Sequence, residues 1–245
     1  MLLNNKVFLV TGASGGIGSA LTSRLAEEGT QLILVGRSEK KLREVIAQTG
    51  KSIITYYNCD FNNSRRIIDI CDKIRGSFPI LDGLINVAGV GIYSPFERSS
   101  LKDFKAMLNV NIMAPFLFTS YLLDRLKKSK QSFVMNIGSG AGTIPMKNRS
   151  TYCASKFALR GLTLSLAEEF DGRQPKFCLI TLGSTLTNFG GKPLEEKKKE
   201  FTKGQAYFPV EWVVNRLKEI IKDENRATEI TLFPGDHGFG VWNKP

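Results

Sequence analysis

The sequence predicts a single α/β domain over residues 1–245, doubly wound, with a parallel sheet of about seven strands and helices on both faces. Short β-rich apolar runs alternate with helical patterns along the chain. The runs 7–10 (VFLV) and 32–35 (LILV) are apolar at every position, which is typical of strands buried on both faces of a parallel sheet. With 245 residues, 42% of them hydrophobic, the chain is long enough for one sizeable core.

The alternating pattern assigns the strands and helices in turn. We expect strands at 6–10, 31–36, 52–57, 83–87, 132–138, 176–182 and 229–233. We expect helices near 16–28, 39–48, 63–76, 101–128, 151–170 and 211–222. The stretch 188–209 follows a strand, shows no strand pattern of its own, and is basic with several aromatic residues. Its place after a strand's carboxyl end predicts a lid over a substrate.

Composition limits the setting in which the protein works. No apolar run reaches the length of a membrane span, and the polar start of the chain is too short for a signal peptide. We therefore expect a cytoplasmic protein without stable membrane insertion. The four cysteines are far apart in the sequence and are predicted to be buried thiols. A single histidine, His237, argues against a metal site, and we expect no metal.

The formal net charge of +11 raises the question of an anionic partner. Lysine and arginine are spread along the chain, and the densest cluster, 197–199, follows two glutamates on a predicted helix. That pattern favours a solvated helix face for the cluster. We expect no nucleic-acid partner, and interpret the charge as a field that attracts anionic small molecules, phosphates included.

A glycine-rich turn, TGASGGIG at 11–18, connects the first strand to the first helix. Glycines allow the backbone to approach a phosphate closely, and the helix N-terminus offers free N–H groups to an anion. The same letters contain G-x-S-x-G, the pattern of a hydrolase nucleophile. That interpretation needs a histidine base, of which only His237 is available, and several strands before the turn, where only one is found. No Lys-Ser/Thr pair follows the glycines, so a P-loop is also excluded.

The pentapeptide YCASK places Tyr152 and Lys156 four residues apart on a predicted helix. Such residues lie on the same helix face, about one turn apart. A nearby cation favours the phenolate and lowers the tyrosine pKa, so the pair is suited to general acid/base chemistry near neutral pH. Taken alone, the pattern also fits a lysine lying along an aromatic ring.

Four motifs in order resolve this ambiguity. They are T-G-x-x-x-G-x-G at 11–18, N-V-A-G at 86–89, Ser139 thirteen residues before Tyr152, and Y-x-x-x-K at 152–156. Together they make the chain, from residue 6 to about residue 233, similar to the short-chain dehydrogenase/reductase family with its Rossmann-type fold. The resemblance implies an oxidoreductase that interconverts a carbonyl and an alcohol by hydride transfer with a nicotinamide cofactor. A non-catalytic regulator or scaffold that retains the fold is the alternative.

The resemblance also implies roles for the four candidate catalytic residues. Tyr152 is expected to act as the general acid/base, and Ser139 to hydrogen-bond the substrate oxygen. Lys156 is expected to lower the pKa of Tyr152 and to hold the cofactor ribose. Asn111, on the long helix 101–128, is expected to hold a water molecule in a proton relay.

The choice of cofactor depends on the end of the second strand. No carboxylate stands there to repel a 2′-phosphate, and the planar guanidinium of Arg37 can pair with one. We therefore predict NADP(H) in preference to NAD(H), although Arg37 could instead stack on the adenine. The cofactor-binding residues are expected to be Gly12, Ser14, Gly15, Gly16, Ile17, Gly18, Arg37, Asp60, Phe61, Asn86, Ala88, Gly89, Tyr152, Lys156, Gly183, Thr185 and Thr187.

The chain departs from the family pattern after the sixth strand. The family usually has Pro-Gly there, whereas this chain has Leu182-Gly183. The change frees the backbone at Leu182, so the nicotinamide pocket is expected to be looser or differently shaped. Thr187 still matches the threonine that contacts the nicotinamide carboxamide.

The substrate side is predicted to be mostly apolar. Tyr93, Met146, Ser184 and Phe189 are expected to line the pocket, with no arginine placed to bind an anion. That composition favours a hydrophobic carbonyl or alcohol substrate. The helices 101–128 and 151–170 are apolar on more than one side, which predicts that they form the interface of a homodimer or homotetramer.

Overall fold

The computed structural model describes residues 1–49 and 54–242 and is built around one parallel sheet. The strands are β1 (Val7–Thr11), β2 (Gln31–Gly36), β3 (Ile54–Asn58), β4 (Gly83–Asn86), β5 (Phe133–Ile137), β6 (Lys176–Leu182) and β7 (Glu229–Leu232). Their order across the seven-stranded sheet is β3-β2-β1-β4-β5-β6-β7, and all the pairs are parallel. The order reverses between β1 and β4, which in open α/β sheets is the point where ligands bind.

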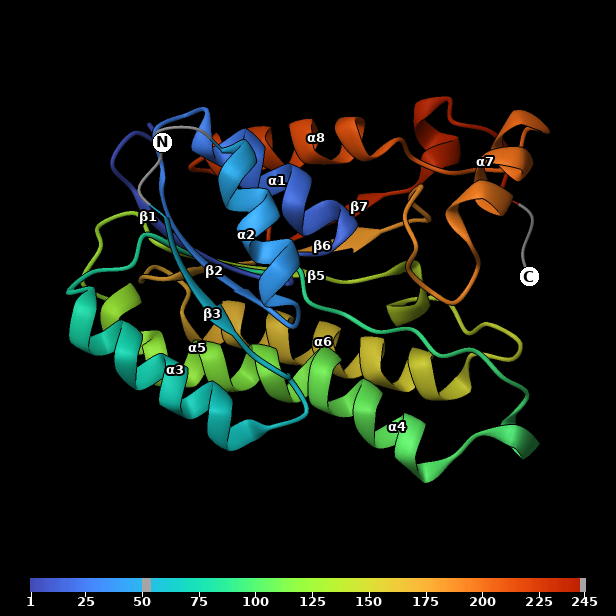
Figure 1. The fold of residues 1–245 in the computed structure, drawn as a ribbon, viewed down its shortest axis with the longest axis horizontal. Coiled ribbons are helices and arrows are strands. Elements are labelled where there is room, and N and C mark those ends of the chain that lie inside the picture. The colour runs from blue at the N-terminus through green and yellow to red at the C-terminus, as the bar shows by residue number, and fades with distance from the viewer. Residues whose placement is uncertain (50–53, 243–245) are drawn as a thin grey trace.

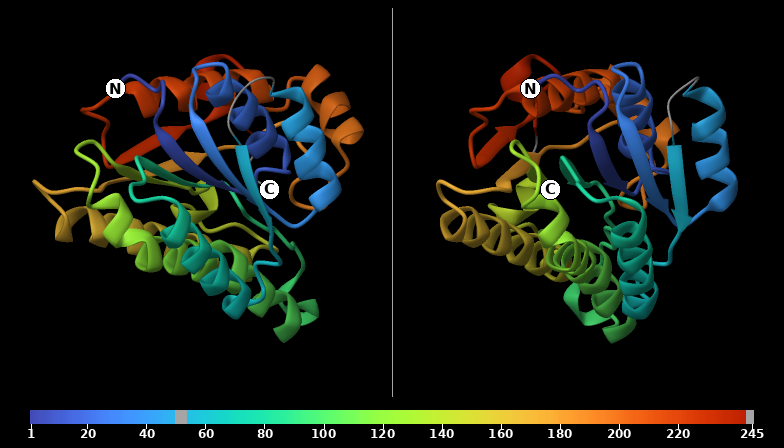
Figure 2. Two further views of the ribbon diagram at one scale, coloured as in Figure 1. Left: turned by 60° about the vertical axis from the view of Figure 1, so that its left-hand side comes forward. Right: turned by 90° about the vertical axis from the view of Figure 1, so that its left-hand side faces the viewer.

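Helices cover both faces of this sheet, as Figure 1 and the turned views of Figure 2 show. One layer contains α1 (Gly16–Ala26), α2 (Glu39–Gln48) and α8 (Val210–Lys222). The other layer contains α3 (Ser64–Ser77), α4 (Leu101–Leu108), α5 (Ala114–Leu126) and α6 (Ser150–Glu169). A further helix, α7 (Leu194–Thr202), lies between β6 and α8 in the sequence and at one end of the molecule. The predicted doubly wound α/β fold is therefore confirmed.

Each face of the sheet has its own hydrophobic core because neighbouring strand residues point in opposite directions. On β1, Phe8 and Val10 pack toward α1 and α8, whereas Leu9 packs toward α3 and α5. All three side chains are fully buried. Burial of a large apolar side chain contributes about 1.5–3 kcal/mol. This two-sided burial explains why the strand runs in the sequence are apolar throughout.

Side-chain caps at the helix N-termini stabilise the helices in addition to this burial. Asn63 precedes α3, and its side chain accepts a hydrogen bond from the amide of Arg66 at 3.0 Å. Ser38 caps α2 in the same way through the amide of Lys41. Such caps satisfy amide groups that have no partner inside the helix.

The helix predicted at 101–128 is interrupted at its centre. Residues 109–113 form a π-helical segment between α4 and α5. Pro115 follows directly and has no N–H to donate to the carbonyl of Asn111 four residues earlier, so the α-helical ladder cannot continue there. Single π-helical turns of this kind are frequent at functional sites. The π-helical segment contains Asn111, one of the predicted catalytic residues.

The remaining elements match their predictions to within a few residues, with two qualifications. Of the strand predicted at 52–57, residues 52 and 53 lie outside the described part of the chain. The stretch 188–209, for which no strand was predicted, contains α7, in agreement with the helix expected around the lysines 197–199. An isolated bridge between Thr185 and Phe208 lies near its end. All four cysteines are buried and free of disulfides, as predicted.

One helical stretch corrects the expectation about membrane spans. The combined helix Leu101–Leu126 is long and apolar enough to cross a membrane by length and composition alone, with a mean hydropathy of 1.4. Half of that stretch is buried inside the protein, where α5 packs against α3 and the sheet. A core helix of an ordinary globular domain passes the same test, so this is weak evidence for a membrane span.

Candidate active site

The glycine-rich turn leaves β1 and packs against the backbone that leaves β4. Gly12 has a φ of +68°, and a Cβ there would lie 2.6 Å from the amide nitrogen of Ala88. A Cβ on Gly18 would overlap the carbonyl oxygen of Gly12. These two glycines are therefore required by the close approach of backbone to backbone.

The N-terminus of α1 is left open by the same turn. Gly15 is the capping residue and supplies no side-chain hydrogen bond, and the first turn of the helix contains no acidic residue. The first amide groups of the helix are thus without a side-chain cap, and the helix dipole adds partial positive charge there. This arrangement suits a phosphate group.

Asn86 connects the central strands below the turn. Its side-chain amide donates a hydrogen bond to Oδ1 of Asn136 on β5 at 2.8 Å, and the amide of Asn136 donates to Thr163 on α6 at 2.8 Å. The Thr11 hydroxyl lies 3.5 Å from Oδ1 of Asn86 and accepts from the backbone amide of Ala88 at 3.3 Å. Buried polar groups at the switch point are thereby paired with one another.

Arg37 lies at the end of β2, exposed and, within the described residues, without a carboxylate partner. The nearest acid along the chain, Glu39, is already paired with Arg43 at 2.8 Å. Asp60 is exposed beyond β3 and accepts hydrogen bonds from Asn62. The guanidinium at the β2 end is therefore available for an anionic ligand.

Phe61, one of the residues predicted to bind the cofactor, has a side chain in the core instead. It is 3% exposed and packs edge-to-face against Phe118 of α5, with ring centroids 6.4 Å apart. Only its backbone remains to face a ligand. Its predicted role in cofactor binding therefore falls to the backbone and stays a prediction.

The segment after β6 returns to the glycine-rich turn. A Cβ on Gly16 would lie 2.8 Å from Cγ2 of Thr187, so the two predicted cofactor-binding segments touch. Gly183 donates its amide to the Leu232 carbonyl at 2.8 Å, and a Cβ there would lie 2.5 Å from Cδ of Pro234. Leu182 is buried and pairs with Leu232. The residue that replaces the family's proline therefore extends the β6–β7 pairing.

Thr185 and Ser184 differ in their surroundings although they are adjacent. Thr185 is buried, whereas Ser184 is exposed. The carbonyl of Ser184 accepts a hydrogen bond from the amide of Phe208 at 2.8 Å. The structure thus ties this stretch to the end of the 188–209 segment through backbone contacts.

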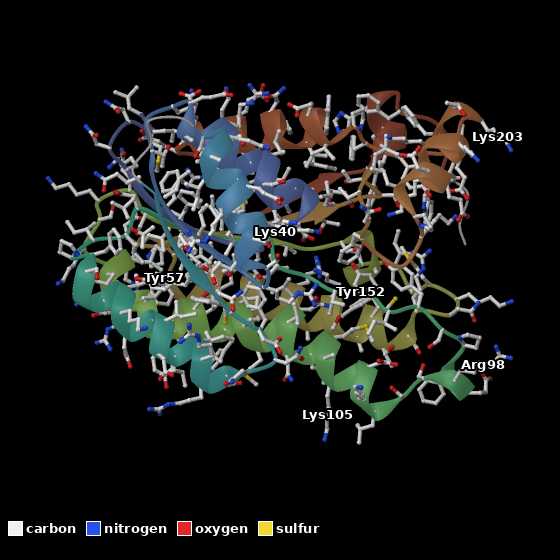
Figure 3. All side chains as sticks on the ribbon, in the orientation of Figure 1. Lys40, Tyr57, Arg98, Lys105, Tyr152 and Lys203 are labelled. Carbon is white, nitrogen blue, oxygen red and sulfur yellow. The ribbon has the colours of Figure 1, made fainter. Side chains whose placement is uncertain are left out.

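Tyr152 and Lys156 lie on the buried face of α6. Figure 3 shows Tyr152 in the same half of the molecule as Lys203. Tyr152 is 3% exposed and Lys156 is 4% exposed. Nζ of Lys156 donates a hydrogen bond to the carbonyl of Ile137, at the end of β5, at 3.0 Å. Burial lowers the pKa of Lys156 to about 8, because the charged ammonium is removed from water.

Burial also dominates the pKa of Tyr152 and raises it above its ordinary value. The neighbouring Tyr93 raises it further, while a hydrogen bond with the Ser139 side chain and the charge of Arg149 lower it. Ser139 and Arg149 thus act on this pKa in the direction that the sequence predicted for Lys156, whose own effect on Tyr152 stays a prediction. The phenol is protonated at neutral pH, ready to donate a proton.

Ser139 and Asn111 approach this pair from two different elements. The Ser139 hydroxyl at the end of β5 accepts a hydrogen bond from the amide of Ala141 at 3.2 Å. The Asn111 side chain accepts from the amide of Val90 and donates to the Val90 carbonyl and to Ser155, each at 2.9 Å. The π-helical segment thus holds the loop after β4 against α6. The amide group of Asn111 is fully engaged in these contacts, so its side chain acts as a brace.

Aromatic side chains cover Tyr152 on the predicted substrate side. The rings of Tyr93 and Tyr152 meet edge-to-face with centroids 5.2 Å apart, and the ring of Phe189 lies 6.1 Å from that of Tyr152. Cβ atoms on Gly89 and Gly91 would meet the Phe189 ring at 3.6 and 2.9 Å. Met146 packs against the same small cluster. The structure brings the predicted pocket residues Tyr93, Met146 and Phe189 together.

Arg149 belongs to this site and was missed from the sequence. Its guanidinium lies over the ring of Tyr93, 4.5 Å from the centroid, and lies 3.5 Å from the sulfur of Met146. No carboxylate in the described part of the chain forms an ion pair with it. The expectation of a pocket wall without an arginine is therefore wrong. The available signal was its position three residues before Tyr152, where it is the N-cap residue of α6.

Lys197 is a second residue for which the structure corrects the sequence prediction. The cluster 197–199 was interpreted as a solvated face, and Lys198 and Lys199 are indeed exposed. Lys197 is only 7% exposed, and its Nζ donates hydrogen bonds to the carbonyls of Thr187 at 2.8 Å and Phe189 at 2.6 Å. No local pattern distinguishes it from its neighbours, since the burial arises from the path of the preceding loop.

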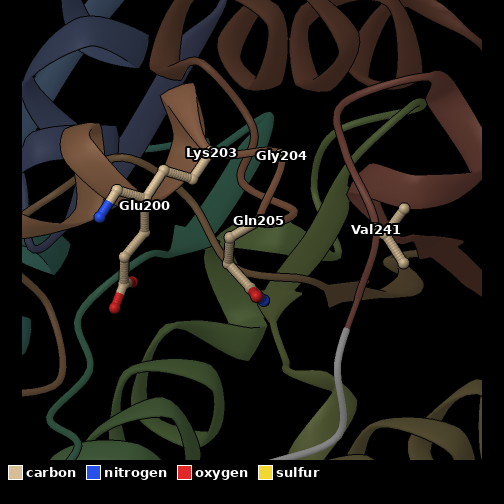
Figure 4. Close-up of a pocket in the computed structure, with 5 residues that line it drawn as sticks. All are labelled: Glu200, Lys203, Gly204, Gln205 and Val241. Atoms are coloured by element: carbon tan, nitrogen blue, oxygen red, sulfur yellow. The ribbon is translucent and has the colours of Figure 1, made fainter.

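A surface hollow of about 380 Å³ lies beside the end of α7 and the segment near the C-terminus (Figure 4). Its lining residues are Glu200, Lys203, Gly204, Gln205 and Val241. The hollow does not include Tyr152, whose surroundings are filled by the rings described above. The histidine required by the hydrolase alternative, His237, packs against Trp212 with the rings tilted by 49° and their centroids 4.7 Å apart.

Comparisons with known proteins agree with this geometry. Residues 6–198 match the family described as short chain dehydrogenase. A D-threitol dehydrogenase of Mycolicibacterium smegmatis is 31% identical over 192 residues, covering 78% of this chain and 74% of that protein. An uncharacterized oxidoreductase of Escherichia coli, YciK, is 32% identical over 208 residues, covering 81% of each chain.

Solved structures give the same result at the level of the whole fold. A short chain dehydrogenase of Shigella flexneri, complexed with NADP, is similar with a TM-score of 0.81 at 27% identity, covering 94% of this chain and 97% of that one. A metagenomic short-chain oxidoreductase in complex with NADP gives a TM-score of 0.79 at 25% identity, with 95% and 98% covered. The chain belongs to the short-chain dehydrogenase family and is an oxidoreductase of that family.

Proposed function

We propose that this protein is an NADP(H)-dependent oxidoreductase that interconverts a carbonyl and an alcohol, with Tyr152 as the general acid/base. One observation carries the proposal. The segment 187–189 touches the glycine-rich turn through Thr187 and the Tyr152 ring through Phe189. The phosphate-binding turn and the buried phenol are thus two sides of one site.

The residues at the cofactor side fit a dinucleotide with a 2′-phosphate. Gly12 and Gly18 allow the turn to pack backbone against backbone, and α1 begins without a side-chain cap, so its first amide groups can meet a phosphate. Arg37 offers an unpaired guanidinium at the β2 end, where an acid would repel a phosphate. That two of the similar solved structures are complexes with NADP supports the same choice.

Bound NADPH supplies the hydride, and the protein residues manage the proton and the orientation of the substrate. The phenol of Tyr152 is protonated at neutral pH because burial raises its pKa, so it can donate to the carbonyl oxygen. The Ser139 side chain lowers the pKa of that phenol through a hydrogen bond, which supports a role for Ser139 in holding the same oxygen. Lys156 is anchored on the Ile137 carbonyl beneath the site.

Hydride transfer tests the central claim. NADPH consumption is measured with a panel of ketones and aldehydes for the wild type, Tyr152→Phe and the exposed control Tyr121→Phe. We expect Tyr152→Phe to lower kcat/KM by about 100-fold or more, because general acid catalysis contributes about that factor. Equal rates for wild type and Tyr152→Phe would rule out the tyrosine mechanism. NADPH binding without turnover of any compound would favour the alternative, a regulator or scaffold that binds NADP.

Cofactor preference has its own measurement. Arg37→Glu should raise the KM for NADPH by about tenfold or more and change the KM for NADH far less, because a phosphate faces the new carboxylate. Arg65→Glu, at an 83% exposed side chain on α3, is the control for the change of net charge. An equal effect on both cofactors would refute the role of Arg37.

The side chains beside Tyr152 and those on the outer helices support a class of substrate and an oligomeric state. The apolar rings beside Tyr152 support a hydrophobic carbonyl or alcohol as substrate.

Phe116, Tyr121 and Phe157 on α5 and α6 are 36–46% exposed, which supports a homodimer or homotetramer through these helices. We place the protein in the cytoplasm. Light scattering coupled to gel filtration measures the assembly, and a monomer would contradict this part of the proposal.

A further inference from the structure

Lys197 is a buried lysine on the surface helix α7, and its burial needs a physical explanation. On α7, Glu195, Glu196, Lys198 and Lys199 are exposed, whereas Lys197 is 7% exposed. Removing an ammonium from water is costly unless the lost hydration is replaced. The replacement here consists of two hydrogen bonds, from Nζ to the carbonyls of Thr187 at 2.8 Å and Phe189 at 2.6 Å.

The two carbonyls belong to the segment that connects both sides of the site. The side chain of Thr187 touches the glycine-rich turn at Gly16. The ring of Phe189 lies over Tyr152 and against the backbone at Gly89 and Gly91. One ammonium thus fixes the backbone positions from which a cofactor-side and a substrate-side group extend.

The surroundings of Lys197 keep its end of α7 in place. Glu200, one turn further along, binds Lys192 at 2.5 Å and the hydroxyl of Tyr207 at 2.6 Å. Burial and the charge of Lys192 lower the pKa of Lys197, and the charge of Glu200 raises it. The helix is therefore anchored at both ends of the 188–209 segment, and Lys197 reaches inward from it.

We propose that Lys197 is a positioning residue, which acts through the Thr187 and Phe189 carbonyls to hold the Phe189 ring over Tyr152 and Thr187 against the glycine-rich turn. This proposal depends on the function proposed above for its kinetic consequences. Its structural consequence does not, because the hydrogen bonds of Lys197 join atoms of this chain alone.

Hydrogen exchange in the free protein tests the structural part. Lys197→Met removes both hydrogen bonds and keeps a long apolar stem, and Lys199→Met changes the same residue type at an exposed position on the same helix. We expect amide exchange in peptides covering 186–191 to be faster by about tenfold in Lys197→Met and unchanged in Lys199→Met. Unchanged exchange in Lys197→Met would overturn the proposal, whether or not the protein is an active reductase.

Steady-state kinetics test the positioning role itself. We expect Lys197→Met to raise the KM for the carbonyl substrate and for NADPH by about tenfold each, with kcat changed less than about threefold. A lysine that only stabilised the fold would lower the melting temperature and leave both KM values unchanged, and that result would overturn the proposal.

A double-mutant cycle shows whether Lys197 acts through Phe189. In a Phe189→Ala background there is no ring to position, so Lys197→Met should then change the substrate KM by less than about twofold. Full additivity of the two substitutions would contradict the mechanism. If Lys197→Met does not fold, Lys197→Gln, which keeps one donor group, is measured in the same cycle with the same expected coupling.

Discussion

The two sides of the candidate site are held together by different kinds of contact. On the cofactor side, backbone packs directly on backbone, and Gly12 lies so close to Ala88 that a Cβ would stand 2.6 Å from its amide nitrogen. On the substrate side, long side chains reach across: the Phe189 ring covers Tyr152, and Lys197 holds the Phe189 carbonyl. The first side is held by backbone packed on backbone, the second by side chains that reach from one segment to another.

This difference decides how each side responds to change. A backbone contact tolerates no added atom, because neither chain segment can move without displacing a strand of the sheet. A side-chain contact can be lost while the scaffold stays intact, because α7 and the loop before it lie outside the sheet. The cofactor side should therefore be rigid, so that substitutions there destabilise the fold. The substrate side should be adjustable, so that substitutions there change binding while the fold stays intact.

Matched glycine substitutions test this contrast most strongly. Gly12 and Gly191 both have positive φ, +68° and +79°, but a Cβ on Gly191 would meet nothing within 4 Å. We expect Gly12→Ala to lower the free energy of unfolding by about 3 kcal/mol or more, from the backbone overlap added to the φ strain. Gly191→Ala carries the φ strain alone and should cost about 1 kcal/mol.

Urea denaturation of both variants measures the difference, and NADPH binding is followed on the same samples. Gly12→Ala should also lose cofactor binding, whereas Gly191→Ala should retain it. If the two variants lost similar stability, the backbone overlap at the turn would not be the determining contact. The contrast between the two sides would then be wrong.

The same contrast explains what could be predicted from the sequence. Gly12, Asn86 and Tyr152 stand at fixed positions relative to strand and helix ends, so their spacing along the chain carries the information. The parallel sheet was predictable for a similar reason, since burial on both faces leaves strands apolar throughout.

What the sequence did not show depends on contacts made across the fold. Nothing local distinguishes Lys197 from Lys198, because only the path of the loop at 187–189 buries one of them. Arg149 was missed because its importance comes from Tyr93, far away in the sequence. The core position of Phe61 likewise depends on α5. The π-helical segment was in principle detectable from Pro115 inside an apolar helix pattern.

The charge of Arg149, on the adjustable substrate side, leads to a prediction whose expected effect is smaller than that of Gly12→Ala. The Arg149 guanidinium, which forms no ion pair within the described residues, lies over Tyr93, next to the phenol of Tyr152. We expect the wild type to reduce a keto acid with a kcat/KM about tenfold above that of its neutral methyl ester, because a charge-assisted hydrogen bond to the carboxylate is gained. Arg149→Met should abolish this preference.

The exposed neighbour Lys147 provides the matched control, since Lys147→Met removes the same charge two residues away. That variant should keep the preference for the keto acid. If Arg149→Met kept it as well, another group would bind the carboxylate, and the guanidinium would serve only to shield the ring of Tyr93.

The smallest expected effect concerns the buried lysine on the rigid side. Burial lowers the pKa of Lys156 to about 8 in the folded protein, against 10.5 for an ordinary lysine. Between these values the unfolded chain binds more protons than the folded one, so the stability that Lys156 contributes rises with pH. It is fully present above about pH 10.5 and is lost as the pH falls through 8. The raised pKa of Tyr152 acts only at pH values above its ordinary 10, outside this window.

The comparison of wild type with Lys156→Met isolates this titration, because all other groups are shared. We expect the wild-type free energy of unfolding to rise relative to that of the variant by about 1 kcal/mol per pH unit between roughly pH 8.5 and 10. Chemical denaturation across that range measures it. A difference that stayed flat would mean that the Ile137 carbonyl and its surroundings stabilise the ammonium as well as water does. Lys156 would then enter the proton transfer fully charged, and the rigid side of the site would hold a fixed positive charge beneath Tyr152.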